Sequence, residues 1–483
     1  MSHYKALLVV FGCLLLAKGQ AFIHPLYSVD AWNEATLWDE GATHYGHFLS
    51  QYRFGLAALL ALFRQFEYSG VQVAFSSVLL ACGLSAVASL FAYLTIDPTG
   101  RRIPYLIFAV IFCLHPFTTE IFTFVDVTLF VCLALAIGLL GTLLVVRAHN
   151  VNVWMVGVAL IVAALSIYQV TLHYILITLL LSIVASLVRG ESIAPVVRAL
   201  VITLFSTALC FAIAKGINAV LHIPTEVRGS LISLAKLPSR ISVVWDALTL
   251  AFWPPQRLIP PVATWVSIGA LSLAVLTILY AIARNRGIAM AALSSAAIIG
   301  AVLWIAGLSI IGSVVWLVPR VLSAVAVLLG GLLALGWMAG SVAVRRILTV
   351  CSIVLAFAYI ASDNRILFDQ WRVNQWDSRQ ALRIFGRFEE LPEFSKLQTI
   401  ILLGGRYGHT APLPSAYKDL NLSSLAPGLA YSATFQQAIG YDLRHPTASE
   451  TAAGNNYCKS APKWPAPQSV TIIGAVGIVC LGG

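Results

Sequence analysis

The chain has 483 residues, of which 59% are hydrophobic and only 10% charged, and its formal net charge is +10. Soluble globular proteins carry about 25% charged residues, so this composition excludes a water-soluble domain. The positive charges lie mainly in short connections between apolar runs, where they set membrane orientation, and the excess therefore does not indicate a nucleic-acid-binding protein.

Apolar runs follow one another up to residue 361. A helix needs about 17 to 25 apolar residues to cross the roughly 30 Å of hydrocarbon in a bilayer. About eleven runs approach this length, and the third and the last are short for a full span. They cover residues 6–23, 71–94, 103–116, 127–146, 151–166, 172–188, 199–221, 263–283, 287–311, 321–339 and 347–361. The sequence therefore predicts an all-α polytopic membrane protein with about eleven transmembrane helices.

Basic residues alternate along the connections and predict the orientation. The short turns 117–126 and 168–171 carry no lysine or arginine, whereas the connections between them do. Because basic loops stay in the cytoplasm, we expect a cytoplasmic N-terminus, and an odd number of helices leaves residues 362–483 outside. An alternative interpretation of the first run is a cleaved signal peptide, which leaves the other helices unchanged. The cytoplasmic markers are Lys5, Arg101, Arg102, Arg147, Arg189, Arg284, Arg286, Arg345 and Arg346.

The organisation that follows is a membrane domain over residues 1–361, with outer loops 24–70 and 222–261, and an extracytoplasmic domain over residues 362–483. In this tail, residues 364–388 predict an amphipathic helix whose arginines share one face, either lying on anionic lipid headgroups or forming the solvated face of a small domain. Residues 399–403 and 469–481 predict β-strands, so we expect a small α/β domain. Cys458 and Cys480 are predicted to form a disulfide there.

Chemistry is expected at the outer loops, because the cytoplasmic connections are short and no Gly-rich loop ending in Lys-Ser or Lys-Thr marks a nucleotide site. In loop 24–70, Asp30 follows the first helix closely, and Arg53 comes later. A carboxylate can accept a proton from a sugar hydroxyl, and an arginine can hold a phosphate. The alternative is that these are solvated loop residues. Three cations of the second loop, Arg228, Lys236 and Arg240, are expected to bind either that phosphate or lipid headgroups.

Sequence segments at successive outer turns resemble the GtrII-type O-antigen glucosyltransferases, a family of multi-spanning type C glycosyltransferases. In order, they read HPLYSVDAW, QYRFG, HPFTTEIFTFVD and LSIYQVTLHY. The resemblance covers the membrane region, includes Arg320 and weakens in the tail. It departs from the family at Val29-Asp30, where paired aspartates are common, and at Arg53, whose neighbours differ from the family's Gly-Arg-Pro-like segment.

This resemblance implies a GT-C-like fold in a bacterial inner membrane, with the C-terminus in the periplasm. The donor would be a polyprenyl-phosphate hexose, such as undecaprenyl phosphate glucose, and the acceptor a glycan such as the O-antigen of lipopolysaccharide. Asp30 would be the general base of an inverting transfer, and Arg53 and Arg320 would bind the donor phosphate. No cofactor and no metal ligand is assigned, and the partners implied are membrane lipids, a donor synthase and a flippase. Substrate-binding positions would be Asp39, Glu40, Glu120, Asp126, Tyr168 and Gln169.

Two other functions remain open at this point. A lipid-linked glycan flippase or transporter would place ionisable residues near the bilayer midplane. The predicted spans carry few, and we expect Lys18, Lys215 and His173 to lie near outer helix ends. An O-antigen ligase or polymerase would be expected to use a large outer loop rich in arginine and histidine, rather than an acidic first loop.

Overall fold

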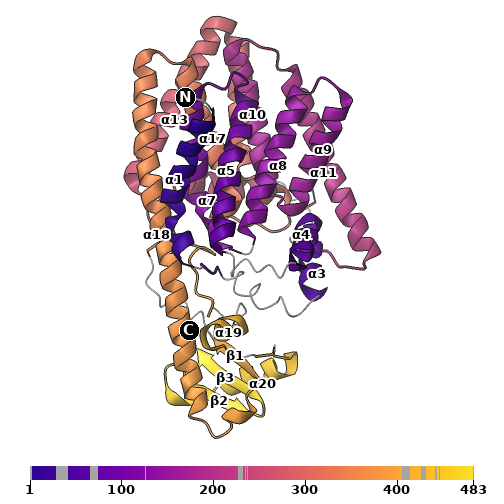
Figure 1. Cartoon of the computed structure of the whole chain (residues 1–483), viewed down its shortest axis with the longest axis vertical. Helices are drawn as coiled ribbons and strands as arrows, with labels where there is room; N and C mark the ends of the chain where they lie inside the picture. Colours follow the sequence, from indigo (N-terminus) through magenta and orange to yellow (C-terminus); the bar gives the residue numbers. More distant parts are fainter. Residues whose placement is uncertain are drawn as a thin grey trace.

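The computed structural model consists of a bundle of long helices and a small domain attached to one end of it (Figure 1). The helices of the bundle are packed side by side, and the N-terminus lies at the end away from the small domain. The structure describes residues 3–24, 26–28, 42–65, 74–125, 127–226, 232–233, 235, 238–404, 414–425, 431–440, 443–444 and 446–481.

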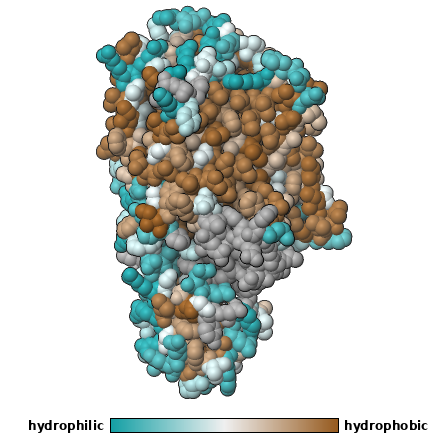
Figure 2. All heavy atoms as spheres, in the orientation of Figure 1, coloured by the Kyte–Doolittle hydropathy of each residue, from teal (hydrophilic) through white to brown (hydrophobic). Residues whose placement is uncertain are grey.

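Eight helices in the described residues are long and apolar enough to cross a membrane, or nine if one bent pair counts as a span. These helices are consistent with a multi-pass membrane protein, and Figure 2 shows a broad hydrophobic surface on the visible face of the bundle, below a hydrophilic end. The eight are α1 (His3–Ile23), α5 (Ala74–Ile96), α8 (Thr128–Arg147), α10 (Thr171–Arg189), α11 (Ala194–Val220), α13 (Pro261–Arg286), α16 with α17 (Pro319–Leu322 and Val325–Ala339) and α18 (Val342–Glu389).

The predicted number of eleven spans is not confirmed, although each predicted run is mainly helical in its described part. Helices α9 (Val151–Ile167) and α14 (Ile288–Trp304) are apolar but shorter than the eight. The run expected over 287–311 breaks after α14 and resumes as α15 (Gly307–Ile311). In the loops predicted to be outer, the chain forms α3 (Ala42–Ser50), α4 (Phe54–Arg64), a short turn of 3₁₀-helix (Pro238–Arg240) and α12 (Ile241–Phe252).

The third predicted run is a broken helix. Helix α6 (Arg102–Leu114) ends at His115, whose backbone is extended, as is usual before a proline. After it, α7 (Pro116–Thr119) and the 3₁₀-turn η1 (Glu120–Thr123) continue at an angle of 49°. The His115 side chain accepts a hydrogen bond from the Phe117 N–H at 3.2 Å and so caps α7. The break turns Glu120 away from the axis of α6.

Arginines gather at the end of the bundle opposite the small domain and hold backbone carbonyls there. Arg147 donates to the Leu94 carbonyl at 2.8 Å, and Arg189 donates to the Ile96 carbonyl at 2.9 Å. Arg198 reaches the Ala148 carbonyl at 3.2 Å. Carbonyls at a helix C-terminus lack partners within the helix, so these side chains satisfy groups that would otherwise remain exposed. The alternation of basic connections found in the sequence therefore corresponds to one end of the molecule.

Helix α18 has 48 residues and runs without interruption from the bundle into the small domain (Figure 1). The predicted span 347–361 and the predicted amphipathic helix 364–388 are thus one helix. Its second half continues away from the bundle, and one of its arginines contacts the small domain: Arg383 lies over the Trp464 ring, 5.6 Å from its centroid. Of the two interpretations of this arginine face, the structure favours the surface of a small domain.

The small domain contains the predicted α/β tail. Strand β3 (Val476–Leu481) lies between β1 (Thr399–Gly404), to which it is parallel, and β2 (Val470–Ile473), to which it is antiparallel. The predicted strand 469–481 is therefore a hairpin, and Gly474 at its turn has a φ of +64°, a value that glycine adopts easily. The helices of the domain are the second half of α18, α19 (Tyr431–Ile439) and α20 (Ala448–Cys458), with short 3₁₀-turns at Phe394–Lys396 and Pro467–Ser469.

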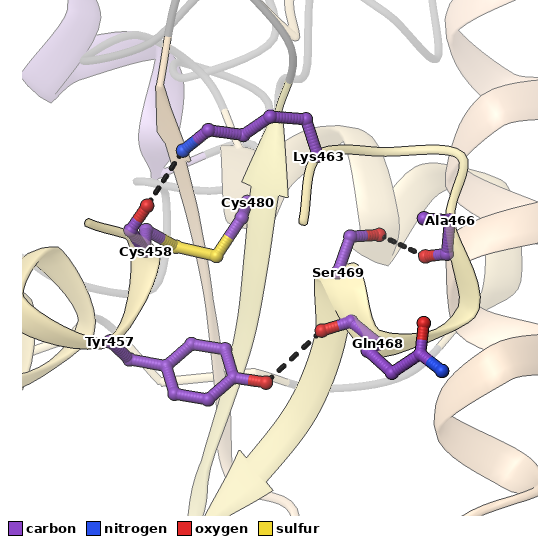
Figure 3. Close-up of a disulfide and its surroundings, with 7 residues drawn as sticks. All are labelled: Tyr457, Cys458, Lys463, Ala466, Gln468, Ser469 and Cys480. Atoms are coloured by element: carbon purple, nitrogen blue, oxygen red, sulfur yellow. Dashed lines mark hydrogen bonds between the residues drawn. A yellow bond between two sulfur atoms is a disulfide. The ribbon is translucent and has the colours of Figure 1, made fainter. Parts of the chain in front are cut away.

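The predicted disulfide between Cys458 and Cys480 is present and joins the end of α20 to β3 (Figure 3). Lys463 donates to the Cys458 carbonyl at 2.7 Å, and the Tyr457 hydroxyl donates to the Gln468 carbonyl at 3.0 Å. These bonds fix the connection between α20 and β2 around the disulfide.

Candidate functional site

The predicted site residues divide into those that the structure describes and those that it does not. Asp30, Asp39, Glu40 and Asp126 lie outside the described residues, as do Arg228 and Lys236 of the second loop. Arg53, Glu120, Tyr168, Gln169, Arg240 and Arg320 are described, and most of them meet at the end of the bundle that faces the small domain.

Arg320 and Glu120 form the centre of this site. Arg320 lies in the first turn of α16, and its Nη1 is paired with Glu120 Oε1. The Arg320 backbone N–H also donates to Glu120 Oε2 at 2.6 Å, so one carboxylate holds both the main chain and the side chain. The ring of Phe124 lies 4.7 Å from the guanidinium carbon. Glu120 is almost completely buried, whereas 16% of the Arg320 side chain remains exposed. The guanidinium is thus held in one orientation, with part of it accessible.

The small domain contributes two residues that the sequence prediction missed. Arg320 Nη2 donates to Asp419 Oδ2 at 3.1 Å, and the neighbouring Lys418 donates to the Leu317 carbonyl. Burial lowers the pKa of Lys418, and the charges of Asp419, Asp246 and Glu120 act in the opposite direction. No local signal marks these residues, because the contact spans 99 positions and depends on how α18 places the small domain.

Two buried aspartates of α18 hold the segment 414–425 that carries Lys418 and Asp419. Asp369 accepts hydrogen bonds from the backbone and the hydroxyl of Ser415. Asp377 accepts from the Ser423 hydroxyl and, at 2.8 Å each, from the backbone and hydroxyl of Ser424. Because both ends of the segment are fixed to α18, its turn reaches Arg320 in a defined position.

Tyr168 lies within electrostatic range of Arg320 and of the second predicted arginine, Arg53. Tyr168 is buried at the end of α9, and the charges of Arg320, Arg53 and Glu120 all act on its hydroxyl. The chain before Arg53 turns sharply, with Tyr52 at a φ of +64°, and the Arg53 backbone N–H donates to the Phe48 carbonyl at 2.9 Å. Both predicted phosphate-binding arginines therefore lie near enough to Tyr168 for their charges to act on it.

The segment around Arg53 is anchored to neighbouring helices. Gln169 donates to the Gln51 carbonyl at 2.7 Å, and a Cβ at Gly55 would overlap the Ser166 hydroxyl, so only glycine allows α4 to approach α9 this closely. Gln51 also donates to Glu226 at 3.1 Å, which links the first outer loop to the second. Gln169 therefore has a structural role, because it fixes the turn that leads to Arg53. Its contact with substrate stays a prediction.

Arg240 of the second loop does not join this cluster through any hydrogen bond described. Its Nη2 donates to the carbonyls of Gly312 and Ser313 at 3.1 and 3.0 Å.

An apolar pocket with about 300 Å³ of empty space lies beside this anchored segment. Tyr52 and Gln169 form its polar side, and the remainder is mostly aliphatic and aromatic: Leu165, Leu172, Thr207, Cys210, Phe211 and Leu308.

A second buried ion pair lies directly before Glu120. Lys18 of α1 is completely buried, and its Nζ is 2.6 Å from the Thr119 hydroxyl and 2.8 Å from Asp363 Oδ2. Thr119 in turn donates to the other oxygen of Asp363. Lys18 is therefore part of a three-residue network joining α1, α7 and α18. In the sequence, the only indication of this network is a lone lysine within an apolar run.

Within the described part of the chain, no group of three or more histidine, cysteine, aspartate or glutamate side chains is arranged to hold a metal ion.

The fold and this cluster define a multi-pass membrane protein with a charged site at one end of its helical bundle, beneath a small α/β domain. The family model described as Glucosyl transferase GtrII matches residues 19–337, and the chain belongs to that family. No curated protein and no solved structure matches the chain. The family match includes Arg53, Glu120, Tyr168, Gln169 and Arg320 and ends before α18, which confirms the family resemblance and makes the chain a glycosyltransferase.

Proposed function

We propose that the protein transfers a hexosyl residue, specifically glucosyl, from a polyprenyl-phosphate donor to a cell-surface glycan such as O-antigen. The observation that carries the proposal is the Arg320 guanidinium, which is held by Glu120 and partly exposed at the end of the bundle opposite the carbonyl-binding arginines. Basic connections mark the cytoplasmic side of a membrane protein, so this site faces the outer side of the bacterial inner membrane. The C-terminal domain is then periplasmic.

The two arginines suit the leaving phosphate of such a donor. Negative charge develops on the phosphate as the glycosidic bond breaks, and a cation held in advance stabilises it without reorganisation. Glu120 orients the Arg320 guanidinium by a two-point contact. The apolar side chains around Gln169 are proposed to contact the first isoprene units of the lipid.

Asp30 is the proposed general base, on the strength of its place in the family motif. It takes the proton from an acceptor hydroxyl, whose oxygen attacks the anomeric carbon while the bond to the lipid phosphate breaks. A single displacement of this kind inverts the configuration at that carbon. Asp39, Glu40 and Asp126 are proposed to bind the sugars.

The test compares Asp30→Asn, Asp39→Asn, Glu40→Gln and Glu120→Gln at matched protein abundance, reading modified glycan repeat units per cell and transfer from a synthetic polyprenyl-phosphate glucose in vitro. Loss of a general base costs about 100- to 10,000-fold in rate, so Asp30→Asn is expected to be inactive while Asp39→Asn and Glu40→Gln keep measurable activity. Glu120→Gln is expected to weaken donor use, because it loosens Arg320. An active Asp30→Asn variant beside an inactive Asp39→Asn variant would move the base to Asp39.

One observation favours a different function, a lipid-linked glycan transporter. Lys18 and Asp363 are ionisable groups buried among the helices, as in transporters. They are paired with each other, however, and the family is one of glucosyl transferases. If the purified protein moved lipid-linked glycan across vesicles without forming a new glycosidic bond, the transporter function would replace the proposed one.

A further inference from the structure

We infer that Gln370 and Asn374 of α18 are positioning residues, which hold residues 26–28, here called the strap, against the Arg320 site. The inference rests on the proposed function, because its activity readout is binding of the donor phosphate by Arg320. The family match ends at residue 337, so these two residues lie outside it.

The two amides bind both polar backbone groups of one strap residue. Asn374 Oδ1 accepts a hydrogen bond from the Tyr27 N–H at 3.0 Å, and Asn374 Nδ2 donates to the Tyr27 carbonyl at 2.8 Å. Gln370 Nε2 donates to the same carbonyl at 2.6 Å. Both amides are buried. The two amides therefore satisfy the backbone N–H and carbonyl of Tyr27, as a neighbouring β-strand would, and they fix the position of the strap along α18.

The other side of the strap touches the turn that carries Glu120. The Ser28 N–H donates to the Thr123 carbonyl at 3.0 Å, and Tyr27 pairs with Phe124 in an antiparallel β-bridge. Phe124 is the residue whose ring lies 4.7 Å from the Arg320 guanidinium carbon. Contacts therefore run from α18 through the strap to Phe124 and from there to Arg320.

The beginning of the strap is fixed to the same helix. The His24 ring stacks on Trp371, one position after Gln370, with ring centroids 4.6 Å apart. With this stack and the two amides, α18 holds the chain on both sides of residue 25. If the strap shifted, Phe124 would therefore be expected to shift with it.

The expected consequence is on donor binding. Misplacement of a binding group by about 1 Å can cost up to about 100-fold in rate. Asn374→Ala removes two of the three amide bonds and is expected to raise the KM for the lipid donor about 10-fold. Gln370→Ala removes one bond and is expected to have a smaller effect in the same direction, about threefold.

Asn364→Ala is the matched control. Asn364 is also an amide on α18 and also binds a carbonyl of the N-terminal segment, that of Leu16 at 2.8 Å, but it makes no contact with the strap. Its replacement is expected to leave the KM for the donor at the parent value.

The experiment uses the full-length protein in lipid nanodiscs with synthetic polyprenyl-phosphate glucose, and measures kcat and KM for the single variants and for Asn374→Ala combined with Arg320→Gln. If Asn374 acts through Arg320, the combined variant is no worse than Arg320→Gln alone. An additive loss, or parent KM values in both Asn374→Ala and Gln370→Ala, would overturn the inference.

Hydrogen exchange separates this inference from the proposed function. Asn374→Ala is expected to increase amide exchange in the peptides containing Ser28 and Phe124, whereas Asn364→Ala is not. Unchanged exchange in Asn374→Ala would also overturn the positioning role. If exchange increases but Arg320→Gln retains the parent KM, the strap is held as inferred and the phosphate-binding role of Arg320 is the part that fails.

Discussion

Lys18 and Asp363 are 345 positions apart in the sequence, yet Lys18 Nζ lies 2.8 Å from the Asp363 carboxylate, and both side chains are completely buried. The Thr119 hydroxyl bonds to both. The pair joins the first helix to the last one of the bundle, directly beside the turn that carries Glu120. Charges this deep in an apolar environment are stable only as a pair, which makes each dependent on the other.

The first prediction concerns this pair. Removal of one partner leaves a buried charge without compensation and is expected to cost about 3–5 kcal/mol, so Lys18→Met and Asp363→Leu should each lower the melting temperature strongly. The double variant Lys18→Met/Asp363→Leu should recover most of the loss. Thermal unfolding in detergent, followed by tryptophan fluorescence, measures all three. A double variant as unstable as the sum of the single ones would show that the ion pair is not the source of the effect.

The second prediction concerns the two arginines. Hydrogen bonds to a charged group contribute about 1.5–3 kcal/mol, so Arg53→Gln or Arg320→Gln should raise the KM for the lipid donor about 10- to 100-fold. Arg320→Lys keeps a cation beside the buried Glu120 but loses the planar fork, and it should be impaired as well. Arg147→Gln is the control, since Arg147 lies at the opposite end of the bundle, where it donates to the Leu94 carbonyl. Parent KM values in both Gln variants would indicate that Lys418 or the second-loop cations bind the phosphate instead.

The third prediction concerns orientation in the membrane. Reporter fusions after Arg102, Arg147 and Arg286 should be cytoplasmic, because short basic connections are not translocated. A fusion after Glu390, which follows α18, should be periplasmic. Paired alkaline phosphatase and green fluorescent protein fusions read the two sides independently. A cytoplasmic signal after Glu390 would place the Arg320 site on the wrong side for a lipid donor presented in the periplasm.

The fourth prediction concerns the disulfide. Cys458 and Cys480 are separated by 22 positions, and closing a loop of that size stabilises a folded domain by about 3 kcal/mol. Cys458→Ala combined with Cys480→Ala should therefore unfold the small domain at a lower temperature while the bundle is unaffected. Limited proteolysis with temperature, read separately for fragments of each part, measures this. Cys210→Ala, which changes a free cysteine within the bundle, serves as the control.

Features encoded by local pattern were predicted well. Apolar runs follow from the thickness of a bilayer, and each of them is mainly helical in its described part. The strand 399–403 follows from its local composition. The disulfide follows from the two cysteines in a tail that is predicted to lie in an oxidising compartment. The number of spans was not confirmed, because composition alone does not reveal a break such as the one at His115, or the shortness of α14.

Features that depend on distant contacts were not predicted. Asp419 reaches Arg320, and Lys418 reaches the Leu317 carbonyl, only because two buried aspartates fix their segment to α18. Lys18 was expected near a helix end, and α1 does end at Ile23, but its burial against a partner 345 positions away was not predicted. Within the candidate site, the charges of Arg53, Arg320 and Glu120, all selected from the family motif, act on Tyr168, and their predicted roles stay predictions. A single sequence shows residue types and spacing, and neither identifies which distant charges will meet.

The continuity of α18 has a consequence for how this protein can change. At 1.5 Å per residue its 48 residues extend about 72 Å, and every inserted residue turns all that follows by about 100°. One extra residue between Ala361 and Asp369 would rotate Asp369, Asn374 and Asp377 away from the bundle, and with them the turn that meets Arg320. The number of residues in this part of α18 therefore sets the position and rotation of the small domain relative to the bundle. An insertion or deletion here is expected to be as damaging as the replacement of a binding residue.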